Sequence, residues 1–383
     1  MWLTGGRIYD VHAGAFRAAD LSIEAGRIAA VGRGPKGAEA IDLDGLWLLP
    51  GFIDCHVHIC INTRVAAGDN VWRDALPGTI AIWAAEAARR MLMCGITTAL
   101  DVGGWDYHEI AVGEAIEAGL IPGPRLMCAG RILSMTSSSA PYYPGMYEQA
   151  DGPEAVRAAA RRQFARGANL AKVMASGAVN STKYERAAAI QYRPDELAAA
   201  VEIARDNFTH VAAHAHAGAT VRNAVLAGCR SVEHGTFLVP TYCTASAFLA
   251  DPACAARARP HVREHYEQRI ALKTASLVRA RELGVTIAMG TDAGTPGNHC
   301  GDNMQEVVLM VERCGFAPAH AIRCATVNGA ALLGREADLG ALEQGRIADV
   351  IAVPRDPLVD IGALREVAFV MKEGHVARHD RRA

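Results

Sequence analysis

Residues 50–58 read Pro50-Gly-Phe-Ile-Asp-Cys-His-Val-His58, and they set the expectations for the rest of the chain. The segment has the pattern of a short apolar strand that ends in two histidines. Side chains at alternate strand positions point to the same side, so His56 and His58 should project together. Two imidazoles placed in this way form a platform for a divalent metal ion. A solvated polar pair is the alternative, but the apolar neighbours Phe52 and Ile53 would make unpaired imidazoles costly.

Short apolar strands alternate with alanine-rich helical stretches along the middle of the chain. The strand candidates are residues 52–59, 97–102, 125–129, 169–175, 210–216, 231–234, 241–244 and 285–292. Helices are predicted between them, for example at 79–94 and at 194–207, where Pro194 suits a first helical position. Eight alternations favour an α/β fold of the (β/α)8 TIM-barrel type over a doubly wound sheet. Residues 134–149 have the pattern of a long loop, and residues 245–269 match no pattern.

The two ends of the chain have a different sequence pattern, in which short strands are separated by turns. Residues 21–31 form one strand–turn–strand pattern, and residues 367–379 form another. Neither end alone would bury a sizeable core. We therefore expect residues 1–50 and 341–383 to pair into one small β-sandwich domain, and residues 51–340 to form the (β/α)8 barrel.

Composition limits the classes of partner. The chain has 383 residues and is 51% hydrophobic, which supplies a core and argues against disorder. Its 39 basic and 41 acidic residues nearly balance, so neither nucleic acid nor a membrane is an expected partner. No run approaches the roughly 18 apolar residues that span a bilayer, and the N-terminus does not resemble a signal peptide. The 10 cysteines include no CxxC pair, so we expect reduced, mostly buried thiols in a cytoplasmic protein.

Further polar residues fall at the carboxyl ends of predicted strands, the rim where barrels build active sites. Lys172 lies in an apolar strand, where an ammonium ion would be costly. A neutral amine there can react with carbon dioxide to give a carbamate that bridges two cations; a snorkelling lysine or a salt bridge is the alternative. His214 and His234 each end a strand, and we interpret them as ligands of a second ion, with hydrogen-bonded core histidines as the alternative.

Asp292 ends the last predicted strand, which a closed barrel places beside the first. An aspartate at this position can cap the next helix. We favour instead a metal ligand that also takes a proton from water and passes it to the leaving group. His216 shares the strand face of His214, and we assign it to carbonyl polarisation or substrate contact.

Taken together, these segments resemble the amidohydrolase superfamily. They are similar in particular to its imidazolonepropionase-related branch, which includes the metal-dependent, prolidase-like Xaa-Pro and Xaa-Arg dipeptidases. The motifs that carry the resemblance are residues 50–58, Ala171-Lys-Val-Met-Ala-Ser-Gly177, Val211-Ala-Ala-His-Ala-His216, Ser231-Val-Glu-His-Gly-Thr236, Met289-Gly-Thr-Asp-Ala-Gly294, Ala325-Thr-Val-Asn-Gly-Ala-Ala-Leu-Leu-Gly334 and Leu339-Gly-Ala-Leu-Glu-Gln-Gly-Arg-Ile-Ala-Asp349.

The resemblance implies two divalent metal ions, with zinc expected, and it assigns roles by position. His56 and His58 would bind the first, more buried ion, and His214 and His234 would bind the second. N6-carboxylated Lys172 would bind both ions. Asp292 would bind the first ion and act as the proton shuttle. His216 is a departure, because related dipeptidases often have a tyrosine there. Barrels of this branch commonly associate, so we also expect a homo-oligomer.

The expected activity is hydrolysis of an amide bond in a dipeptide or N-acyl amino acid by a metal-bridging hydroxide. The alternative is a non-peptide C–N bond, as in a cyclic amide, a carbamate or an aryl urea. A catalytically dead amidohydrolase scaffold is disfavoured because every expected ligand is present. A deaminase is disfavoured because residue 217 is alanine, where single-metal relatives usually have glutamate. The candidate substrate contacts are His216, Tyr142, Tyr143, Tyr184, Arg186 and His299.

Overall fold

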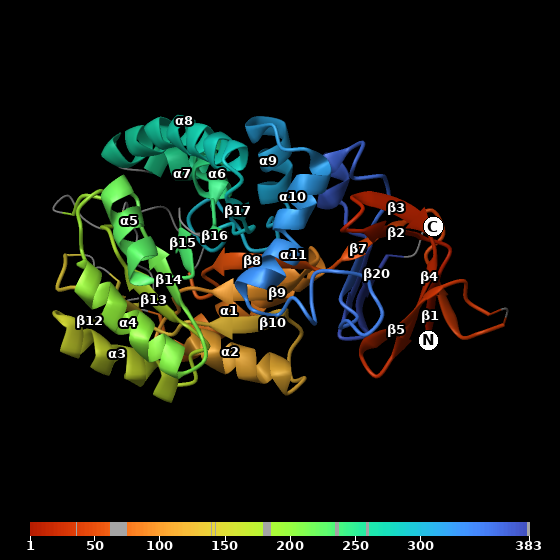
Figure 1. The fold of residues 1–383 in the computed structure, drawn as a ribbon, viewed down its shortest axis with the longest axis horizontal. Coiled ribbons are helices and arrows are strands. Elements are labelled where there is room, and N and C mark those ends of the chain that lie inside the picture. The colour runs from red at the N-terminus through yellow and green to blue at the C-terminus, as the bar shows by residue number, and fades with distance from the viewer. Residues whose placement is uncertain are drawn as a thin grey trace.

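The centre of the fold is a barrel of parallel strands surrounded by helices (Figure 1). The computed structural model describes residues 1–35, 37–61, 75–138, 140–141, 143–178, 185–233, 237–257 and 260–380. Within these residues the barrel contains eight parallel strands, which confirms the predicted α/β fold class. They are β8 (Phe52–Val57), β9 (Ile96–Asp101), β10 (Arg125–Cys128), β13 (Ala171–Met174), β14 (Val211–His214), β15 (Ser231–Glu233), β16 (Phe237–Leu238) and β17 (Thr286–Ile287).

Backbone hydrogen bonds close the barrel between its last and first strands. Cys55 N–H donates to Met289 O at 2.9 Å, and Asp292 N–H donates to His56 O at 2.7 Å. On the other side, Asn169 N–H donates to Cys128 O at 2.7 Å, just before β13 begins. The closure brings residues 289–293 beside β8, although they are far apart in the sequence.

Helices cover the outside of the barrel, as the alternating pattern predicts. They are α1 (Pro77–Met93), α2 (His108–Glu117), α3 (Pro153–Ala165), α4 (Pro194–Asp206), α5 (Gly218–Ala227), α6 (Tyr242–Ala250), α7 (Pro252–Arg257), α8 (Pro260–Glu282), α9 (Gln305–Cys314), α10 (Pro318–Cys324) and α11 (Val327–Leu332). In α4, Pro194 occupies the first turn as expected. The Glu196 carboxylate accepts hydrogen bonds from Arg193 N–H at 2.8 Å and Gly152 N–H at 2.9 Å, which fixes the start of this helix.

Two sequence predictions need correction. Residues 241–244 were expected to form the seventh strand, but the structure places that strand at β16 and starts α6 here instead. Thr241 has a left-handed backbone (φ 46°), and the Glu306 carboxylate accepts the first two N–H groups of α6, so the chain turns into a helix. The predicted loop 134–149 is wrong at its ends, where β11 (Ile132–Ser134) and β12 (Tyr147–Gln149) pair in parallel.

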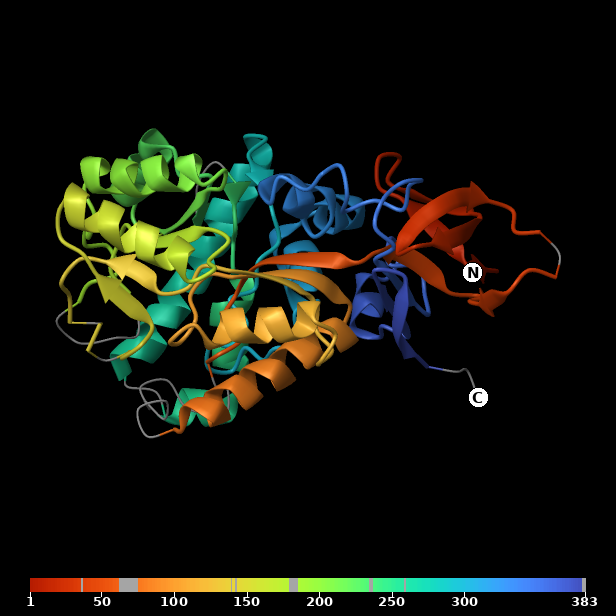
Figure 2. The same ribbon diagram turned by 90° about the horizontal axis from the view of Figure 1, so that it is seen from below.

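The two ends of the chain meet in a small β domain on the right of Figures 1 and 2. Its strands are β1 (Trp2–Thr4), β2 (Arg7–Asp10), β3 (Ala15–Ala18), β4 (Asp20–Glu24), β5 (Arg27–Gly32), β6 (Ala40–Asp42), β7 (Trp47–Pro50), β18 (Val350–Val353), β19 (Phe369–Lys372) and β20 (His375–His379). They form one sheet in the order β5-β4-β1-β6 and another in the order β20-β19-β18-β7-β2-β3. Because β18 pairs with β7, both ends of the chain share one sheet. Domain boundaries at residues 50/51 and 340/341 stay a prediction.

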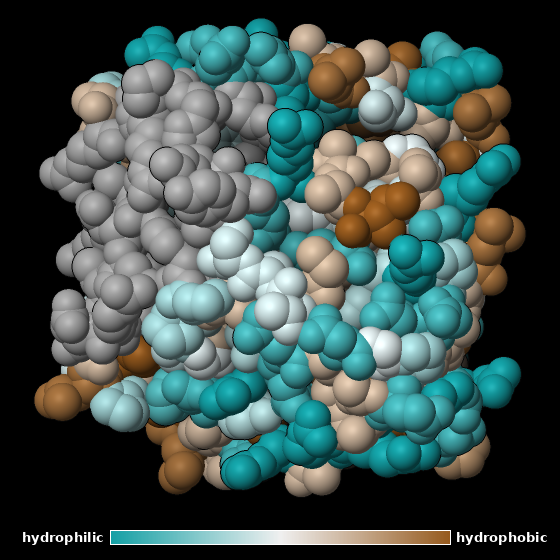
Figure 3. Space-filling view, turned by 90° about the vertical axis from the view of Figure 1, so that its left-hand side faces the viewer, coloured by the Kyte–Doolittle hydropathy of each residue, from teal (hydrophilic) through white to brown (hydrophobic). Residues whose placement is uncertain are grey.

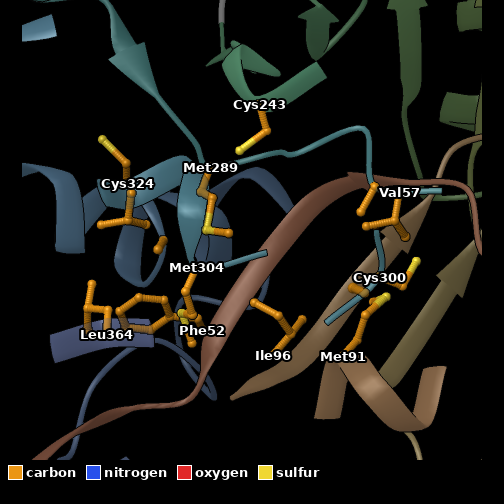
Figure 4. Packing of buried hydrophobic residues seen from close by; sticks show 14 of the residues in the cluster. Phe52, Val57, Met91, Ile96, Cys243, Met289, Cys300, Met304, Cys324 and Leu364 are labelled. Atoms are coloured by element: carbon orange, nitrogen blue, oxygen red, sulfur yellow. The ribbon is translucent and has the colours of Figure 1, made fainter. Parts of the chain in front are cut away.

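The largest hydrophobic cluster packs the outer face of β8 against α1 and the C-terminal helices. In Figure 4, Phe52 lies near Met304 and Leu364, the latter from the short 3-10 helix η2 (Ile361–Arg365). Sulfur atoms are frequent in this cluster, and all ten cysteines, each in the described part of the chain, are free thiols that are buried or half-buried. The reduced state itself stays a prediction. Among the described helices, none is both long and apolar enough to cross a bilayer.

Candidate metal centre and active site

Three potential metal ligands converge at the carboxyl ends of the first and last barrel strands. His56 Nε2 and His58 Nε2 lie 3.3 Å apart. Asp292 Oδ1 lies 3.5 Å from His56 Nε2 and 3.4 Å from His58 Nε2. A tetrahedral ion with ligands at about 2.1 Å requires ligand atoms about 3.4 Å apart, so this triangle has the size of a metal site. Both histidines are buried, and Asp292 is partly exposed.

The two glycines of the Gly-Thr-Asp-Ala-Gly motif allow the strands that carry these ligands to approach closely. A Cβ on Gly290 would lie 2.2 Å from Val239 Cγ1 and 2.9 Å from His56 Cβ. A Cβ on Gly294 would lie 2.0 Å from His58 O, and this residue also has a positive φ of 111°. The pairing of β8 with β9 also shifts register between Asp54 and Val57, the kind of irregularity that re-aims side chains near active sites.

Asp292 is held in a strained conformation that directs its carboxylate to the histidines. Its φ is 60°, which is uncommon for a residue other than glycine and costs about 1–2 kcal/mol. Its second oxygen, Oδ2, accepts a hydrogen bond from Thr244 Oγ1 at 3.1 Å. The next helix, α9, starts only at residue 305. The capping alternative for Asp292 is therefore wrong.

A buried carboxylate, Asp54, ties the first strand to the last. It accepts hydrogen bonds from Thr291 Oγ1 and Asn303 Nδ2, both at 2.7 Å, and from the N–H groups of His56 and Thr291, both at 3.1 Å. The side chain is fully buried, and burial raises its pKa. Four donors around one carboxylate hold the backbone at His56 in place.

The orientation of His58 is fixed by a hydrogen bond on its other ring nitrogen. Nδ1 lies 2.9 Å from Gly103 O, and because a carbonyl only accepts, Nδ1 carries the proton and Nε2 keeps its lone pair. The pKa of His58 is lowered to about 4, mainly by burial. The charge of Asp292 raises this pKa, and the charges of His56 and Lys172 lower it. Asp101 accepts from Gly103 N–H at 3.1 Å and Ile59 N–H at 2.8 Å, which holds this segment in place.

Lys172 and His214 lie on the neighbouring strands β13 and β14. Lys172 is 2% exposed and close enough for its charge to act on His58. His214 is directly opposite Met174 in the strand register, and its Nε2 lies 3.3 Å from Gly177 O. The rings of His214 and His216 are in edge contact, with centroids 4.1 Å apart. His234 lies outside the described residues.

Helix α8 brings residues to the rim that the sequence did not reveal. The Arg269 guanidinium donates to His216 Nδ1 across 2.6 Å, and Ser176 Oγ accepts from His216 N–H at 2.9 Å. Lys273, one helical turn after Arg269, reaches Thr241. No sequence signal marks these contacts. Each contact joins residues that are more than 30 positions apart, and the segment that contains Arg269 matches no recognisable motif. The i, i+4 spacing of two cations is the only pattern in the sequence.

The remaining candidate substrate contacts are dispersed. Tyr143 packs on the main hydrophobic cluster and lies near Tyr147, with ring centroids 6.1 Å apart. Arg186 is exposed, and His299 is half-buried with an electrostatic interaction to Asp251. None of these three is placed at the metal triangle by a hydrogen bond or ion pair among the described residues. Tyr142 and Tyr184 lie outside the described residues.

The parallel barrel and the group of potential ligands at its rim are typical of one class of protein, the TIM-barrel hydrolases with a metal site at the carboxyl ends of their strands. The chain belongs to the amidohydrolase family, whose family model matches residues 47–377. It is therefore an enzyme, a hydrolase of a family that generally uses metal ions.

Relatives and solved structures narrow the likeness. Ochratoxinase from Aspergillus niger is 34% identical, and the match covers 85% of this chain and 75% of the relative. A prolidase complexed with N-methylphosphonate-L-proline superposes with a TM-score of 0.89, at 29% identity and over 99% of both chains. A Xaa-Pro dipeptidase with bound methionine superposes with a TM-score of 0.88, at 30% identity and over 98% of both chains. The predicted resemblance to the amidohydrolases and their prolidase-like branch is confirmed.

Proposed function

We propose that this protein is a binuclear metal-dependent amidohydrolase that cleaves the C–N bond of a dipeptide or an N-acyl amino acid. The observation that carries the proposal is the triangle of His56, His58 and Asp292, whose spacing suits one divalent ion. The prolidase and Xaa-Pro dipeptidase likenesses support the choice of substrate. The cytoplasmic location and the homo-oligomer predicted above belong to the same proposal.

The residues present fit two ions. His56, His58 and Asp292 would hold the first ion, and His214 and His234 would hold the second. Lys172, buried on the strand between them, would join both as a carbamate. Nitrogen and oxygen donors of this kind suit zinc without excluding manganese, cobalt or iron. When bound, the ions would lower the pKa of a water molecule toward neutrality and polarise the substrate carbonyl.

Within this site the side chains of the protein would move the proton and orient the substrate. Asp292 Oδ2 already accepts a hydrogen bond from Thr244, which holds the carboxylate while it takes the proton of the attacking water. Asp292 then returns that proton to the departing nitrogen. His216 would donate a hydrogen bond to the oxyanion that develops on the carbonyl oxygen.

A substrate panel tests the proposal. Purified protein supplied with zinc should hydrolyse at least one member of a set of Xaa-Pro dipeptides, other dipeptides and N-acetyl amino acids. Chelation with 1,10-phenanthroline should stop the reaction, and added zinc should restore it. Turnover of no amino-acid amide at all would contradict the proposed substrate class.

The second candidate is an enzyme for a non-peptide C–N bond. It is supported by ochratoxinase, a relative that is 34% identical to this chain and that is not named as a peptidase. Cyclic amides, carbamates and aryl ureas tested beside the peptides separate the two candidates, because only the second predicts turnover confined to these compounds.

A further inference from the structure

The long helix α8 places two cations at the rim of the active site. Arg269 and Lys273 are four residues apart, so they lie on the same face of the helix. Lys273 Nζ donates to Thr241 O at 2.5 Å and to Thr241 Oγ1 at 3.0 Å. Arg269 Nη2 donates to His216 Nδ1 at 2.6 Å. Helix α8 therefore contacts His216, which follows strand β14, and Thr241, which precedes α6.

A short path of contacts leads from Lys273 to Asp292. Thr244 Oγ1 lies 3.1 Å from Thr241 O, the carbonyl that Lys273 contacts. The same hydroxyl lies 3.1 Å from Asp292 Oδ2. The two cations thus stand on the side of the site where Asp292 and His216 are found, and their charges interact with Asp292.

Among the described residues, Lys273 forms no ion pair that would neutralise its charge. Within the described residues no carboxylate oxygen comes within salt-bridge distance of its Nζ. The nearby carboxylate of Glu306 is engaged by the N–H groups of Tyr242 and Cys243, at 2.8 and 2.7 Å. Burial and the charge of Arg269 lower the pKa of Lys273 to about 8. An ammonium group has three N–H donors, so one remains for a ligand.

We propose that Lys273 and Arg269 bind the carboxylate of the substrate and so select amides that carry one beside the scissile bond. This inference rests on the proposed function and deepens it. A guanidinium offers a planar fork and an ammonium offers a point charge, and both suit a carboxylate. Because Asp292 would return its proton to the departing nitrogen, the nearest carboxylate is that of the released amino acid.

The test compares substrates that differ only in the carboxylate. N-acetyl-L-phenylalanine is paired with N-acetylphenethylamine, and N-acetyl-L-proline with N-acetylpyrrolidine. The wild-type enzyme should favour the acid of each pair in kcat/KM by about 10- to 100-fold, as expected for a charged hydrogen bond. Lys273→Met should raise KM for the acid by a similar factor and should affect the neutral amide much less. Lys273→Arg, which keeps a cation, should retain most of the preference for the acid.

A matched control lies on the same helix. Arg279→Gln also removes one cation from α8, but Arg279 is exposed and pairs with Glu282, so the preference should not change. Equal effects of Lys273→Met on acid and neutral amide would overturn the inference while leaving the proposed function in place.

Binding without turnover supplies an independent readout. In calorimetric titrations of the wild-type protein, 3-phenylpropionate should bind about tenfold or more tightly than 3-phenylpropanol. Equal affinities would overturn the inference even if the Lys273 variants failed to fold. Absence of turnover with every amide, together with tight binding of 3-phenylpropionate, would contradict the proposed function alone.

Discussion

Asp292 combines an unusual backbone conformation, contacts with two histidines and a hydrogen bond from Thr244. Its left-handed backbone turns the carboxylate back toward the first strand, where Oδ1 meets His56 and His58. Its Oδ2 accepts from Thr244, on a helix that the sequence did not predict. The side chain is thus fixed on both oxygens while staying partly exposed, which suits a group that binds an ion and exchanges a proton.

Replacing this carboxylate by an amide should affect turnover much more than binding. We expect Asp292→Asn to lower kcat by about 10²- to 10⁴-fold with little change in KM, because the amide keeps the size of the side chain but cannot relay a proton. Steady-state kinetics on the best panel substrate provide the measurement. Asp302→Asn, at an exposed position ten residues further on, is the control, and a loss expressed mainly in KM would contradict the assigned role.

Residues that end apolar strands were predictable, and residues that arrive from a helix were not. His56, His58 and Asp292 interrupt buried strands with polar groups, and the barrel pattern places strand ends at one rim. Arg269 and Lys273 reach that rim only because of how α8 lies over it. Their contacts depend on long-range packing, and no local pattern encodes the direction of a helix relative to the barrel.

At the scale of elements, the proposed metal site requires the last strand and the first to lie close together. Gly290 permits this approach, since a methyl group would lie 2.2 Å from Val239 Cγ1 and 2.9 Å from His56 Cβ. Most elements here follow from sequence, including α1, α4 and the terminal hairpins. The start of α6 did not, because the N–H acceptor that fixes it, Glu306, lies more than 60 residues away.

Gly290→Ala should therefore push these two strands apart. We expect a loss of about 1–3 kcal/mol in the free energy of unfolding, as for other overpacked cores, with a lower metal content. Denaturant unfolding and metal analysis measure both. Gly78→Ala in α1, where an added Cβ meets nothing within 4 Å, should be neutral or stabilising by up to about 1 kcal/mol. Similar effects of the two substitutions would argue against the close approach.

Helix α2 carries a fully buried carboxyl group that makes stability depend on pH. Burial, and next the charge of Asp101, raise the pKa of Glu109 from 4.5 to about 8. Because the folded-state pKa is the higher one, the stabilising contribution is complete below about pH 4 and is lost as the pH rises through 8. Glu109→Gln stays neutral throughout, so the wild-type protein should lose stability relative to this variant between pH 5 and pH 9. Urea unfolding at these pH values checks this, and a constant difference would contradict it.

At the scale of the whole molecule, the β domain packs against the barrel through an ion-pair network in which Arg125 and Asp349 are largely buried. Arg125, on β10, donates to Asp349 Oδ2 at 3.0 Å and to Thr98 Oγ1 at 2.8 Å, and it also pairs with Glu373 at 2.5 Å. The side chains of Arg125 and Asp349 are only 15% and 7% exposed. The arrangement links the end of the barrel away from the active site to the C-terminal segment of the β domain.

Removing Arg125 should leave Asp349 buried without its cation. We expect Arg125→Met to lower the free energy of unfolding by about 2–4 kcal/mol while kcat stays near its wild-type value, because the site is at the other end of the barrel. Chemical denaturation and kinetics give both quantities. Arg355→Met removes an exposed arginine that pairs with Glu366, and this control should cause little change. A large loss of kcat for Arg125→Met would show that the β domain acts on the site.

The central claim is that separate strands gather two divalent ions around one water molecule, and metal analysis of the purified protein tests it most directly. Mass spectrometry of the metals should find about two divalent ions per chain in an active preparation. Lys172→Ala should lose most of them, while Lys172→Glu, which restores a carboxylate, should retain more. Full turnover by protein that holds well under one ion per chain, or unchanged metal content in Lys172→Ala, would contradict the account.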